Sequence, residues 1–416
     1  MRQRWNRITM LEACDLITCG VAARPKYVDE GIPFLSAKNV KKGQIIYEGY
    51  NCITKENHEE LTKKNKPLVG DILYTRVGSY GEAAVIEEVI EFSVFVSLTL
   101  IKPKKELLNS YFLKYYLNSN EIKTLAKNSI TSSGVGNLNV GTVRKFPVPI
   151  PPLPEQQRIV SILDKAFAAI DQAKANAEQN LQNAKELFES YLQGVFENGD
   201  WETSTIQEIT RVINGYAFKS KDFKPTHSVK SIKITNVGVK EFVEETDNYL
   251  PEEFGETLNK VQVKDGDIVI ALTRTIIAAG LKVAVVPATY DGALVNQRVA
   301  ALVANEENVR PSYLYYYLTT KGVADYVLAH VNTLMQPNLS INDLKTLPVP
   351  LPSTDEQENI VSQLDSMQSK TQKLEAVYQQ KMDDLEELRK SILQKAFAGE
   401  LDTSASSVTK EKGVVV

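Results

Sequence analysis

FPVPIPPLPEQQRIVSILD, residues 146–164, returns as LPVPLPSTDEQENIVSQLD at residues 347–365, an offset of 201 residues. The same offset continues without a gap to SYLQGVF (190–196) and SILQKAF (391–397). Of the 52 positions that it aligns from Phe146 onward, 19 are identical. A long internal match at one offset indicates a duplicated structural unit. The chain is therefore predicted to contain two copies of one architecture.

The repeat extends upstream of the proline-rich motif with small shifts in spacing. The matching pairs are FLKYYL (112–117) with YLYYYL (313–318), GDILYTR (70–76) with GDIVIALTR (266–274), SAKNV (36–40) with KITNV (233–237), and Trp5 with Trp201. Each copy thus consists of a globular unit followed by a long helix. The predicted domains are a first globular unit at 1–150, a helix at 151–199, a second globular unit at 200–350, a helix at 351–400 and a disordered tail at 401–416.

The globular units are predicted to mix strands and helices. Short runs rich in β-branched residues, such as DILYTRV, FSVFVSLTLI, DIVIALT and LKVAVVP, stand between Gly, Asn and Pro residues that favour turns. One amphipathic helix is expected in each unit, at 109–127 and at 310–329. Because strands and helices do not strictly alternate, the expected fold class is α+β rather than a doubly wound sheet.

Both long helices have an apolar stripe at alternating spacings of three and four residues, which is typical of a coiled coil. The expected stripe positions are Leu163, Ala166, Ile170, Ala173, Ala177, Asn180, Ala184, Leu187 and Tyr191 in the first helix, and Leu364, Met367, Thr371, Leu374, Tyr378, Lys381, Leu385, Leu388 and Ile392 in the second. The first set is small and the second is bulky, so the two helices should pair with each other. Chain connectivity favours an antiparallel hairpin with one globular unit at each end, related by a pseudo-two-fold axis.

Composition places the chain among globular proteins, because 43% of its residues are hydrophobic and 24% are charged. It contains no apolar run long enough for a transmembrane helix, and its first residues lack the continuous apolar stretch of a signal peptide. The three cysteines, Cys14, Cys19 and Cys52, form no CxxC pair, which fits a reduced compartment. A cytoplasmic location is therefore expected.

The distribution of charge bears on nucleic-acid binding. The net charge of −4 argues mildly against DNA, because DNA-binding domains are usually basic. However, residues 1–150 contain 21 basic and 15 acidic residues, which gives this segment a charge of +6. The helical segment 351–416 has a charge of −4. The total charge therefore neither excludes nor establishes DNA binding.

At this point the residues resemble a known family. The motifs PVPIPPLPEQ and PVPLPSTDEQ each lead into IVS-x-LD and a long helix that ends in LQ-x-x-F. They are similar to the central and C-terminal repeats of type I restriction–modification specificity subunits. FLKYYL and YLYYYL, followed by GNLNVGTVRKFPVP and PNLSINDLKTLPVP, also match that family's pattern. The resemblance covers residues 1 to about 400, and the doubled motif is highly specific.

The resemblance implies a function and a set of partners. In that family each globular unit is a target recognition domain that reads one half of a bipartite site in double-stranded DNA. The helices set the gap and dock two modification (adenine methyltransferase) subunits, to which a translocating restriction subunit is added. S-adenosylmethionine, ATP and magnesium then belong to the partners, and this chain binds no cofactor. The second motif reads PSTDEQ where the first reads PPLPEQ, a difference that affects at most the start of the second helix.

The sequence offers no catalytic site. It lacks a Gly-x4-Gly-Lys-Ser/Thr phosphate loop and an Asn/Asp-Pro-Pro-Tyr/Phe run for a flipped adenine. The histidines His58, His227 and His330 are isolated and do not have the spacing of metal ligands. Glu121-Ile-Lys123 is a short match to a nuclease motif, but it lies in a predicted helix. We therefore expect a DNA-binding subunit without catalytic residues and without a metal site.

DNA contacts are expected from polar residues in turns beside the strands. Arginine can bond guanine edges, asparagine and glutamine suit adenine, and lysine mainly neutralises phosphate. The candidates in the first unit are Lys38, Asn39, Lys41, Lys42, Arg76, Ser79, Tyr80, Ser132, Ser133 and Asn137. Those in the second are Tyr216, Lys219, Lys233, Thr235, Asn236, Arg274, Thr275, Gln336 and Asn338. Arg76 and Arg274 align in the repeat, and each follows a strand after Gly-Asp, so this pair is the best candidate.

Two other classes of protein remain open from the residues alone. One is a coiled-coil adaptor whose two globular domains bind proteins. The other is a nuclease or methyltransferase in one chain, which the missing motifs disfavour. Salt-sensitive and sequence-selective DNA binding would distinguish a DNA reader from an adaptor, because phosphate contacts release counterions.

Overall fold

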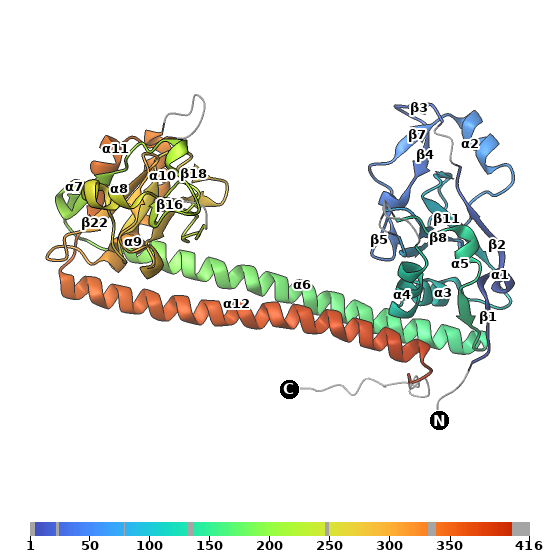
Figure 1. Cartoon of the computed structure of the whole chain (residues 1–416). Helices are drawn as coiled ribbons and strands as arrows, with labels where there is room; N and C mark the ends of the chain where they lie inside the picture. Colours follow the sequence, from blue (N-terminus) through green and yellow to red (C-terminus); the bar gives the residue numbers. More distant parts are fainter. Residues whose placement is uncertain are drawn as a thin grey trace, which may run out of the picture. The chain divides into compact units, whose positions relative to one another are not determined.

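The computed structural model describes residues 5–21, 25–78, 80–130, 136–245, 249–331 and 338–401 (Figure 1). Its contacts divide the chain into two units. Unit 1 is assembled from two distant segments, 1–178 and 380–416, whereas unit 2 is the continuous segment 179–379. The unit boundaries therefore lie inside the two long helices. Most of the tail expected at 401–416 is outside the described residues.

Unit 1 is built on a four-stranded antiparallel sheet of order β2-β11-β8-β9, next to a smaller sheet of order β10-β4-β7-β3. The strands are β2 (Cys14–Cys19), β3 (Tyr27–Val28), β4 (Ile32–Leu35), β7 (Asn51–Ile53), β8 (Ile72–Thr75), β9 (Ala83–Val85), β10 (Ser93–Val94) and β11 (Leu98–Pro103). Successive side chains of a strand point to opposite faces. Ile72 and Tyr74 accordingly pack against the helices, while Leu73 packs with Leu35 and Phe92 from the region of the smaller sheet.

Unit 2 repeats this arrangement. Its main sheet has the order β14-β22-β17-β20 and its smaller sheet the order β16-β15-β21. The strands are β14 (Thr210–Asn214), β15 (Val229–Ile232), β16 (Tyr249–Leu250), β17 (Ile268–Ala271), β20 (Val283–Val285), β21 (Leu294–Val295) and β22 (Val299–Ala304). Unit 1 adds the hairpin β5 (Val40–Lys41) and β6 (Gln44–Ile45), and unit 2 adds β18 (Ile276–Ile277) and β19 (Gly280–Leu281). The predicted internal repeat and α+β class are confirmed.

The PVP part of each repeated motif is a strand. β12 (Pro147–Pro149) pairs antiparallel with β1 (Arg7–Thr9), and β23 (Pro348–Pro350) pairs with β13 (Thr203–Thr205). The helices α1 (Met10–Ala13) and α7 (Ile206–Ile209) follow β1 and β13, and each begins with a Thr–Glu capping box. The remaining short helices are α2 (Lys55–Thr62), α5 (Val140–Val143), α8 (Glu252–Thr257) and α11 (Ile341–Lys345).

The single amphipathic helix expected in each unit is in fact a pair of helices. Residues 109–127 form α3 (Ser110–Leu117) and α4 (Asn120–Asn128), and residues 310–329 form α9 (Pro311–Leu318) and α10 (Lys321–His330). Ser119 and Thr320 start the second helix of each pair, because their hydroxyl groups accept hydrogen bonds from the N–H groups three residues later. The apolar periodicity continues across the break, which is why it looked like one helix.

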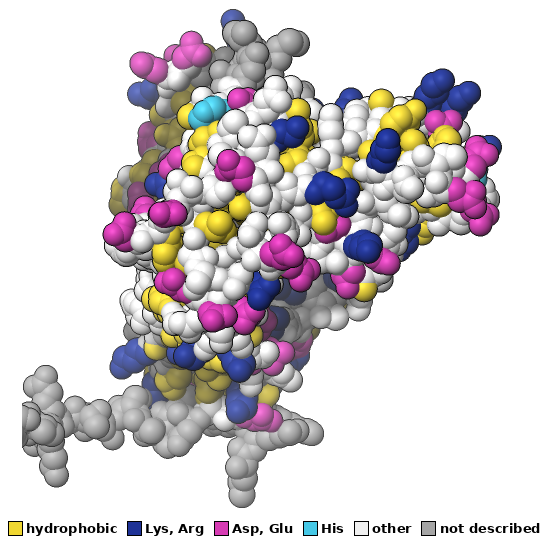
Figure 2. All heavy atoms as spheres, turned by 90° about the vertical axis from the view of Figure 1, so that its left-hand side faces the viewer, with side chains coloured by type: hydrophobic (Ala, Val, Ile, Leu, Met, Phe, Trp, Pro, Cys, Tyr) yellow, Lys and Arg dark blue, Asp and Glu magenta, His cyan; other side chains and the backbone are white. Residues whose placement is uncertain are grey.

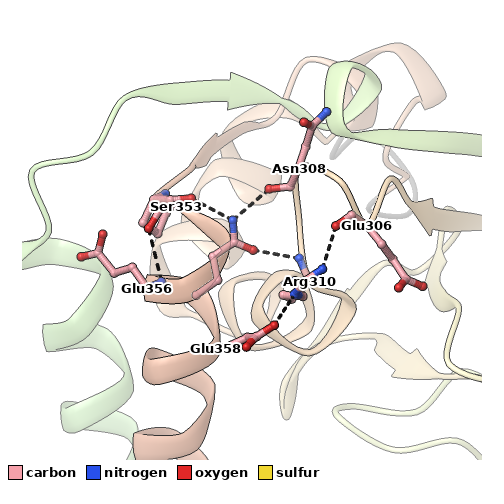
Figure 3. A network of polar contacts seen from close by, with 8 residues as sticks. Glu306, Asn308, Arg310, Ser353, Glu356 and Glu358 are labelled. Carbon is pink, nitrogen blue, oxygen red and sulfur yellow. Dashed lines mark hydrogen bonds and ion pairs between the residues drawn. The ribbon is translucent and has the colours of Figure 1, made fainter.

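The glutamine of each EQ motif connects a long helix to the globular part of its unit. Gln357 is fully buried: its Oε1 accepts from the N–H of Arg310 at 2.8 Å, and its Nε2 donates to the carbonyls of Asn308 and Pro352 at 2.9 Å. Asn308 and Arg310 thus converge on the start of the helix (Figure 3). Gln156 makes the three equivalent bonds in unit 1. The difference between PPLPEQ and PSTDEQ therefore leaves this junction unchanged.

The long helices are α6 (Leu153–Asn198) and α12 (Thr354–Phe397). In unit 1, Asp171 pairs with Arg389 at 2.5 Å and Lys174 with Glu386 at 2.6 Å, so numbers that rise along α6 fall along α12 (Figure 1). In unit 2, the hydroxyl group of Tyr191 donates to Gln363 at 3.1 Å. Within unit 1 the ion pairs alone show that the two helices run antiparallel, as expected.

The seam between these helices differs from the expected stripe at five positions, whose side chains are exposed. Ile170, Ala177, Ala184, Leu364 and Thr371 are buried as expected, but Leu187, Leu374 and Leu388 are 48%, 41% and 47% exposed. Asn180 and Lys381 are exposed too. Next to these five exposed positions, the partly covered residues lie one position further on, at Leu181, Phe188, Glu375, Met382 and Arg389. Ala166, Ala173 and Met367 are partly covered as expected. Over 180–188 of α6 and 374–389 of α12 the spacing therefore alternates with the opposite phase. Polar residues can occupy such seam positions, as Arg389 does by lying over the ring of Phe167.

The phenylalanine that ends each long helix packs on a pair of aromatic rings. In unit 1, Phe397 of α12 lies 5.3 Å from Phe112 and 5.1 Å from Tyr116, measured between ring centroids. In unit 2, Phe196 of α6 has the same relation to Tyr313 and Tyr317. The LQ-x-x-F motif thus closes the apolar core of each unit. None of the described helices is long and apolar enough to cross a membrane.

Candidate nucleic-acid interface

In unit 1, three polar turns meet beyond the end of β8. The N–H of Arg76 donates to the carbonyl of Ser97 at 3.0 Å, and its carbonyl accepts from the N–H of Leu138 at 2.8 Å. The hydroxyl group of Ser97 accepts from the N–H of Ala37 at 3.0 Å. These bonds bring the turn at 36–39, the loop after β8 and the loop at 136–138 to one place. Sequence-predicted candidates from all three segments are therefore neighbours.

Exposed cations surround this meeting point. Lys38 is exposed in the turn at 36–39, and Lys41 and Lys42 are exposed in the β5–β6 hairpin. Lys42 and Gly43 have φ angles of +51° and +75°, which fit the two-residue turn that tight hairpins prefer. Tyr80 is half-buried, and its ring lies so close to Gly136 that a Cβ there would be 2.9 Å from Cε1. The other candidates of this loop region, Ser79, Ser132 and Ser133, are outside the described residues.

Two candidates of unit 1 have structural roles instead. Asn39 is only 1% exposed: its Oδ1 accepts from the N–H of Ser36, and its Nδ2 donates to the carbonyls of Ile46 and Glu48. Arg76 is 8% exposed. Its guanidinium donates to the carbonyls of Leu138 and Val96 and to Oδ1 of the exposed Asn137. Asn39 and Arg76 thus hydrogen-bond to the backbone of the turns and expose little surface, and their expected DNA contacts stay predictions.

The same framework exists in unit 2. Asn236 is fully buried, its Oδ1 accepts from the N–H of Lys233 at 2.8 Å, and its Nδ2 donates to the carbonyl of Val243 at 2.8 Å. It therefore supports the turn at 233–236 as Asn39 does in unit 1. Thr275 is fully buried as well, which removes a further candidate from the surface. Thr235, between Lys233 and Asn236, is exposed.

The structure changes the alignment of the two arginines. The carbonyl of Arg76 accepts from the N–H of Leu138. In unit 2, the residue whose carbonyl accepts the equivalent bond, from Leu339 at 2.9 Å, is Leu272 rather than Arg274. The repeated sequence GDILYTR and GDIVIALTR differ in length, and the sequence match placed the extra two residues before the arginine. Arg76 and Arg274 are therefore not structural equivalents.

Arg274 instead occupies the place of Gly78. Isolated β-bridges join Val77 to Asn137 and Thr273 to Asn338, so Val77 corresponds to Thr273. The next residues, Gly78 and Arg274, therefore correspond to each other. Both have positive φ, +76° for Gly78 and +49° for Arg274. A left-handed backbone is strained for a residue with a side chain, and such strain is often found at functional positions. The side chain of Arg274 is exposed, and its N–H donates to Oδ1 of Asn338.

Sequence reasoning missed three polar residues of this region of unit 2. Lys282 donates from Nζ to the carbonyl of Ile234 at 2.8 Å, and burial, followed by repulsion from Arg274, lowers its pKa. Gln297 and Arg298 are exposed in the turn between β21 and β22. A signal was available, since DGALVNQRVA places three consecutive polar residues between two apolar runs. The repeat hid it, because the equivalent stretch FSVFVSLTLI is apolar apart from serine and threonine.

Of the remaining candidates of unit 2, Tyr216 bonds directly to the same turn. Tyr216 is 47% exposed; its N–H donates to the carbonyl of Val295, and its carbonyl accepts from the N–H of Gln297. Lys219 is exposed, whereas Lys233 is half-buried with Nζ 4.0 Å from the centre of the Phe223 ring. Gln336 is outside the described residues. Figure 2 shows basic and acidic side chains interspersed on one face of the molecule.

Two sequence features that bear on catalysis can be located in the structure. No group of three or more His, Cys, Asp or Glu side chains that could hold a metal ion occurs among them. Glu121 and Lys123, the short match to a nuclease motif, lie in α4 and pair with Arg7 at 2.5 Å and with Glu82 at 2.6 Å. These two pairs connect α4 to neighbouring elements of unit 1, which is a structural role.

Comparisons with known proteins agree with this description. A family model described as "Type I restriction modification DNA specificity domain" matches residues 11–182 and 198–381. The type I restriction enzyme MjaVIII specificity subunit of Methanocaldococcus jannaschii is 26% identical over 388 residues, which are 89% of this chain and 86% of that protein. The EcoKI specificity subunit of Escherichia coli is 22% identical over 399 residues, 90% of this chain and 83% of that protein.

Two solved structures show the same fold. A chain from a structure titled as the basis of complex assembly and conformational transition of the type I R-M system has a TM-score of 0.75 and 18% identity, and the match covers 95% of this chain and 98% of that chain. The HsdS subunit of Thermoanaerobacter tengcongensis has a TM-score of 0.59 and 16% identity, with 96% and 97% covered. At these identities the likeness concerns the fold.

Proposed function

We propose, on the premise that this chain belongs to the type I restriction modification DNA specificity family, that unit 1 and unit 2 each read one half of a bipartite DNA site. The family model matches twice, once in each predicted half of the chain. The chain is thus a specificity subunit with two recognition domains. In this role it selects the DNA sequence on which a restriction–modification enzyme acts.

One observation carries the proposal at the level of residues. In both units, a buried asparagine, a strand end and the turn before the next long strand are joined by matching hydrogen bonds. This framework is the same in the two units, but the exposed side chains that it presents differ. Lys38, Lys41 and Lys42 are exposed in unit 1, and Arg274, Gln297 and Arg298 are exposed in unit 2. A common framework with different exposed polar groups suits two readers of different DNA sequences.

The chemistry of the enzyme is then assigned to partners. We propose that two modification subunits bring S-adenosylmethionine, and that restriction subunits bring ATP and magnesium, while this chain binds no cofactor and catalyses no reaction. The relatives are described as specificity subunits, which supports this division. Such an assembly acts on the DNA of its own cell, which supports a cytoplasmic location. The mass of the purified assembly, determined by light scattering, tests the proposed pair of modification subunits.

Methylome sequencing tests the function. The chain is co-expressed with its modification subunit in cells that lack adenine methyltransferases. We expect methylated adenines in one gapped sequence, and no methylation when either protein is expressed alone. Methylation that does not depend on this chain would refute the proposal.

A domain exchange tests the two independent readers. Residues 200–345 are replaced by the corresponding segment of another specificity subunit. We expect one half of the methylated sequence to change and the other half to stay the same. The matched control replaces residues 1–145 and should change only the opposite half. If either exchange altered both halves, the units would not be independent readers.

A further inference from the structure

The turn Asn296–Arg298 in unit 2 stands where the segments of the candidate interface meet. The N–H of Asn296 donates to the carbonyl of Ile232 at 3.0 Å, directly before the turn at 233–236. The N–H of Gln297 donates to the carbonyl of Tyr216 at 3.0 Å, and the carbonyl of Arg298 accepts from the N–H of Leu272 at 2.8 Å. Three segments thus fix the backbone of this turn, and the backbone in turn fixes the direction of each Cα–Cβ bond.

Arg274 and Arg298 are both connected to Leu272 through the backbone. Arg298 contacts the backbone of Leu272 directly, and Arg274 follows Leu272 by two residues. Both side chains are exposed. In the described parts of the chain, only three arginines have guanidinium groups without a hydrogen bond, ion pair or ring contact: Arg211, Arg274 and Arg298. Arg211 differs from the other two because its charge acts on Asp267. The donors of Arg274 and Arg298 are therefore available to a ligand.

Unit 1 uses the same positions differently. The residue in the place of Leu272 is Arg76, whose guanidinium donates inward to two carbonyls and one amide oxygen. The residue in the place of Arg298 is Ser97, which is buried and bonded to the N–H of Ala37. Gly78 stands in the place of Arg274. Unit 1 thus has an internal arginine and no exposed one here, whereas unit 2 has an internal leucine and two exposed arginines.

The backbone at Arg274 supports a specific role for its side chain. Its φ angle of +49° is unfavourable for any residue with a Cβ, and glycine fills the equivalent position of unit 1. An arginine that only adds positive charge near the phosphates does not require a fixed backbone, because long-range electrostatic attraction tolerates many geometries. A fixed backbone position is useful when the planar guanidinium has to donate hydrogen bonds to two acceptors at once.

We propose that Arg274 and Arg298 are specificity-determining residues that read guanine in the half-site of unit 2. Each guanidinium would bond O6 and N7 of a guanine in the major groove, the pairing that best fits its two parallel N–H groups. The half-site of unit 1, by contrast, is read without arginine from these positions. This inference rests on the proposed function and adds to it the chemical class of base that one unit recognises.

The test measures the methylated sequence for single variants of the full chain in the co-expression system. R298A and R298K both remove the two-pronged donor, but R298K keeps the charge. R274G removes the side chain at a position whose φ angle suits glycine, so it should not disturb folding. R211A is the matched control, because Arg211 is exposed and lies on β14 outside the turn. The urea midpoint followed by Trp201 fluorescence verifies that unit 2 remains folded in each variant.

We expect R298A, R298K and R274G each to lose preference for one guanine of one half-site by on the order of tenfold to a hundredfold, with the other half unchanged. R211A should methylate as the unchanged chain does. The inference is wrong if that half-site contains no guanine, if R298K keeps the original preference, or if the variants weaken methylation equally at all sequences. The last two results would indicate phosphate contacts. Failure of the proposed function is distinguishable, since the unchanged chain would then direct no gapped methylation at all.

Discussion

Replacing Gln357 by alanine should destabilise unit 2 markedly, because the side chain is fully buried and makes three hydrogen bonds. The change leaves one N–H group and two carbonyl groups without their partner at the junction of α12 with the loop before α9. At about 1 kcal/mol for each lost bond, the free energy of unfolding should fall by about 3 kcal/mol. This value is a large part of the stability of a typical domain.

The two tryptophans of the chain permit the measurement, because Trp5 belongs to unit 1 and Trp201 to unit 2. Trp201 donates from Nε1 to Glu356 at 3.0 Å, next to the altered residue. The substitution W5F leaves Trp201 as the only tryptophan. It removes no hydrogen bond among the described residues, because Nε1 of Trp5 has no partner there. Equilibrium unfolding in urea is then followed by Trp201 fluorescence.

With a urea slope of about 2 kcal/mol per molar, Q357A should lower the midpoint by about 1.5 M. The matched control is Q372A, because Gln372 is exposed on the same helix. Its expected effect is within about 0.5 kcal/mol, as for most surface changes. If Q357A and Q372A shifted the midpoint equally, the buried glutamine would not hold the junction together, and the physical account of the repeated EQ motif would have to be abandoned.

Two other properties can be predicted from the structure. F397A should lower the free energy of unfolding of unit 1 by about 3 kcal/mol, because it leaves a cavity beside Phe112 and Tyr116, and F397L should lower it less. Urea unfolding followed by Trp5 fluorescence measures both variants. Equal midpoints for F397A and the unchanged chain would contradict this prediction. Burial raises the pKa of the Cys14 thiol to about 12, so its reactive thiolate is scarce below pH 11. At pH 8 an aromatic disulfide reagent should modify Cys14 at least about a hundredfold more slowly than half-buried Cys52, and comparable rates would show that Cys14 is accessible.

The duplicated architecture could be predicted from the sequence because the same contacts recur at the same offset. Gln156 and Gln357 bond equivalent partners, and so do Asn39 and Asn236. A pattern that is constrained by packing and by buried hydrogen bonds stays recognisable after duplication. The positions of the strands in each unit were predictable for the same reason, since their apolar runs are buried on both faces.

The phase of the coiled coil could not be predicted from apolar content. Leu187, Leu374 and Leu388 looked like seam residues, yet the partly covered positions are one residue further on. A polar residue such as Arg389 can occupy a seam position because its long side chain lies over the ring of Phe167 and its charge pairs with Asp171. At this point of α12 the leucine, Leu388, is therefore exposed, and the arginine, Arg389, lies in the seam.

The candidate interface was the least predictable part, because a polar residue in a turn can serve the protein or the ligand. Asn39 and Asn236 are polar and lie in turns, but their side chains satisfy backbone groups of their own units. Arg76 and Arg274 matched in sequence and differ in structure by two positions. Arg298 escaped notice since its counterpart in the repeat is Ser97. Which polar groups face outward is decided by hydrogen bonds that a single sequence does not display.

The assembly of unit 1 from two distant segments has a consequence for protein synthesis. Residue 178 leaves the ribosome long before residue 380, because the 201 residues of unit 2 must be translated in between. At about 5 to 20 residues per second, the nascent first unit waits roughly 10 to 40 seconds for the helix end that covers Phe112 and Tyr116. During this interval its aromatic surface is open to other nascent chains and to chaperones. Unit 2, whose residues are contiguous, can finish folding before the unit that was begun first.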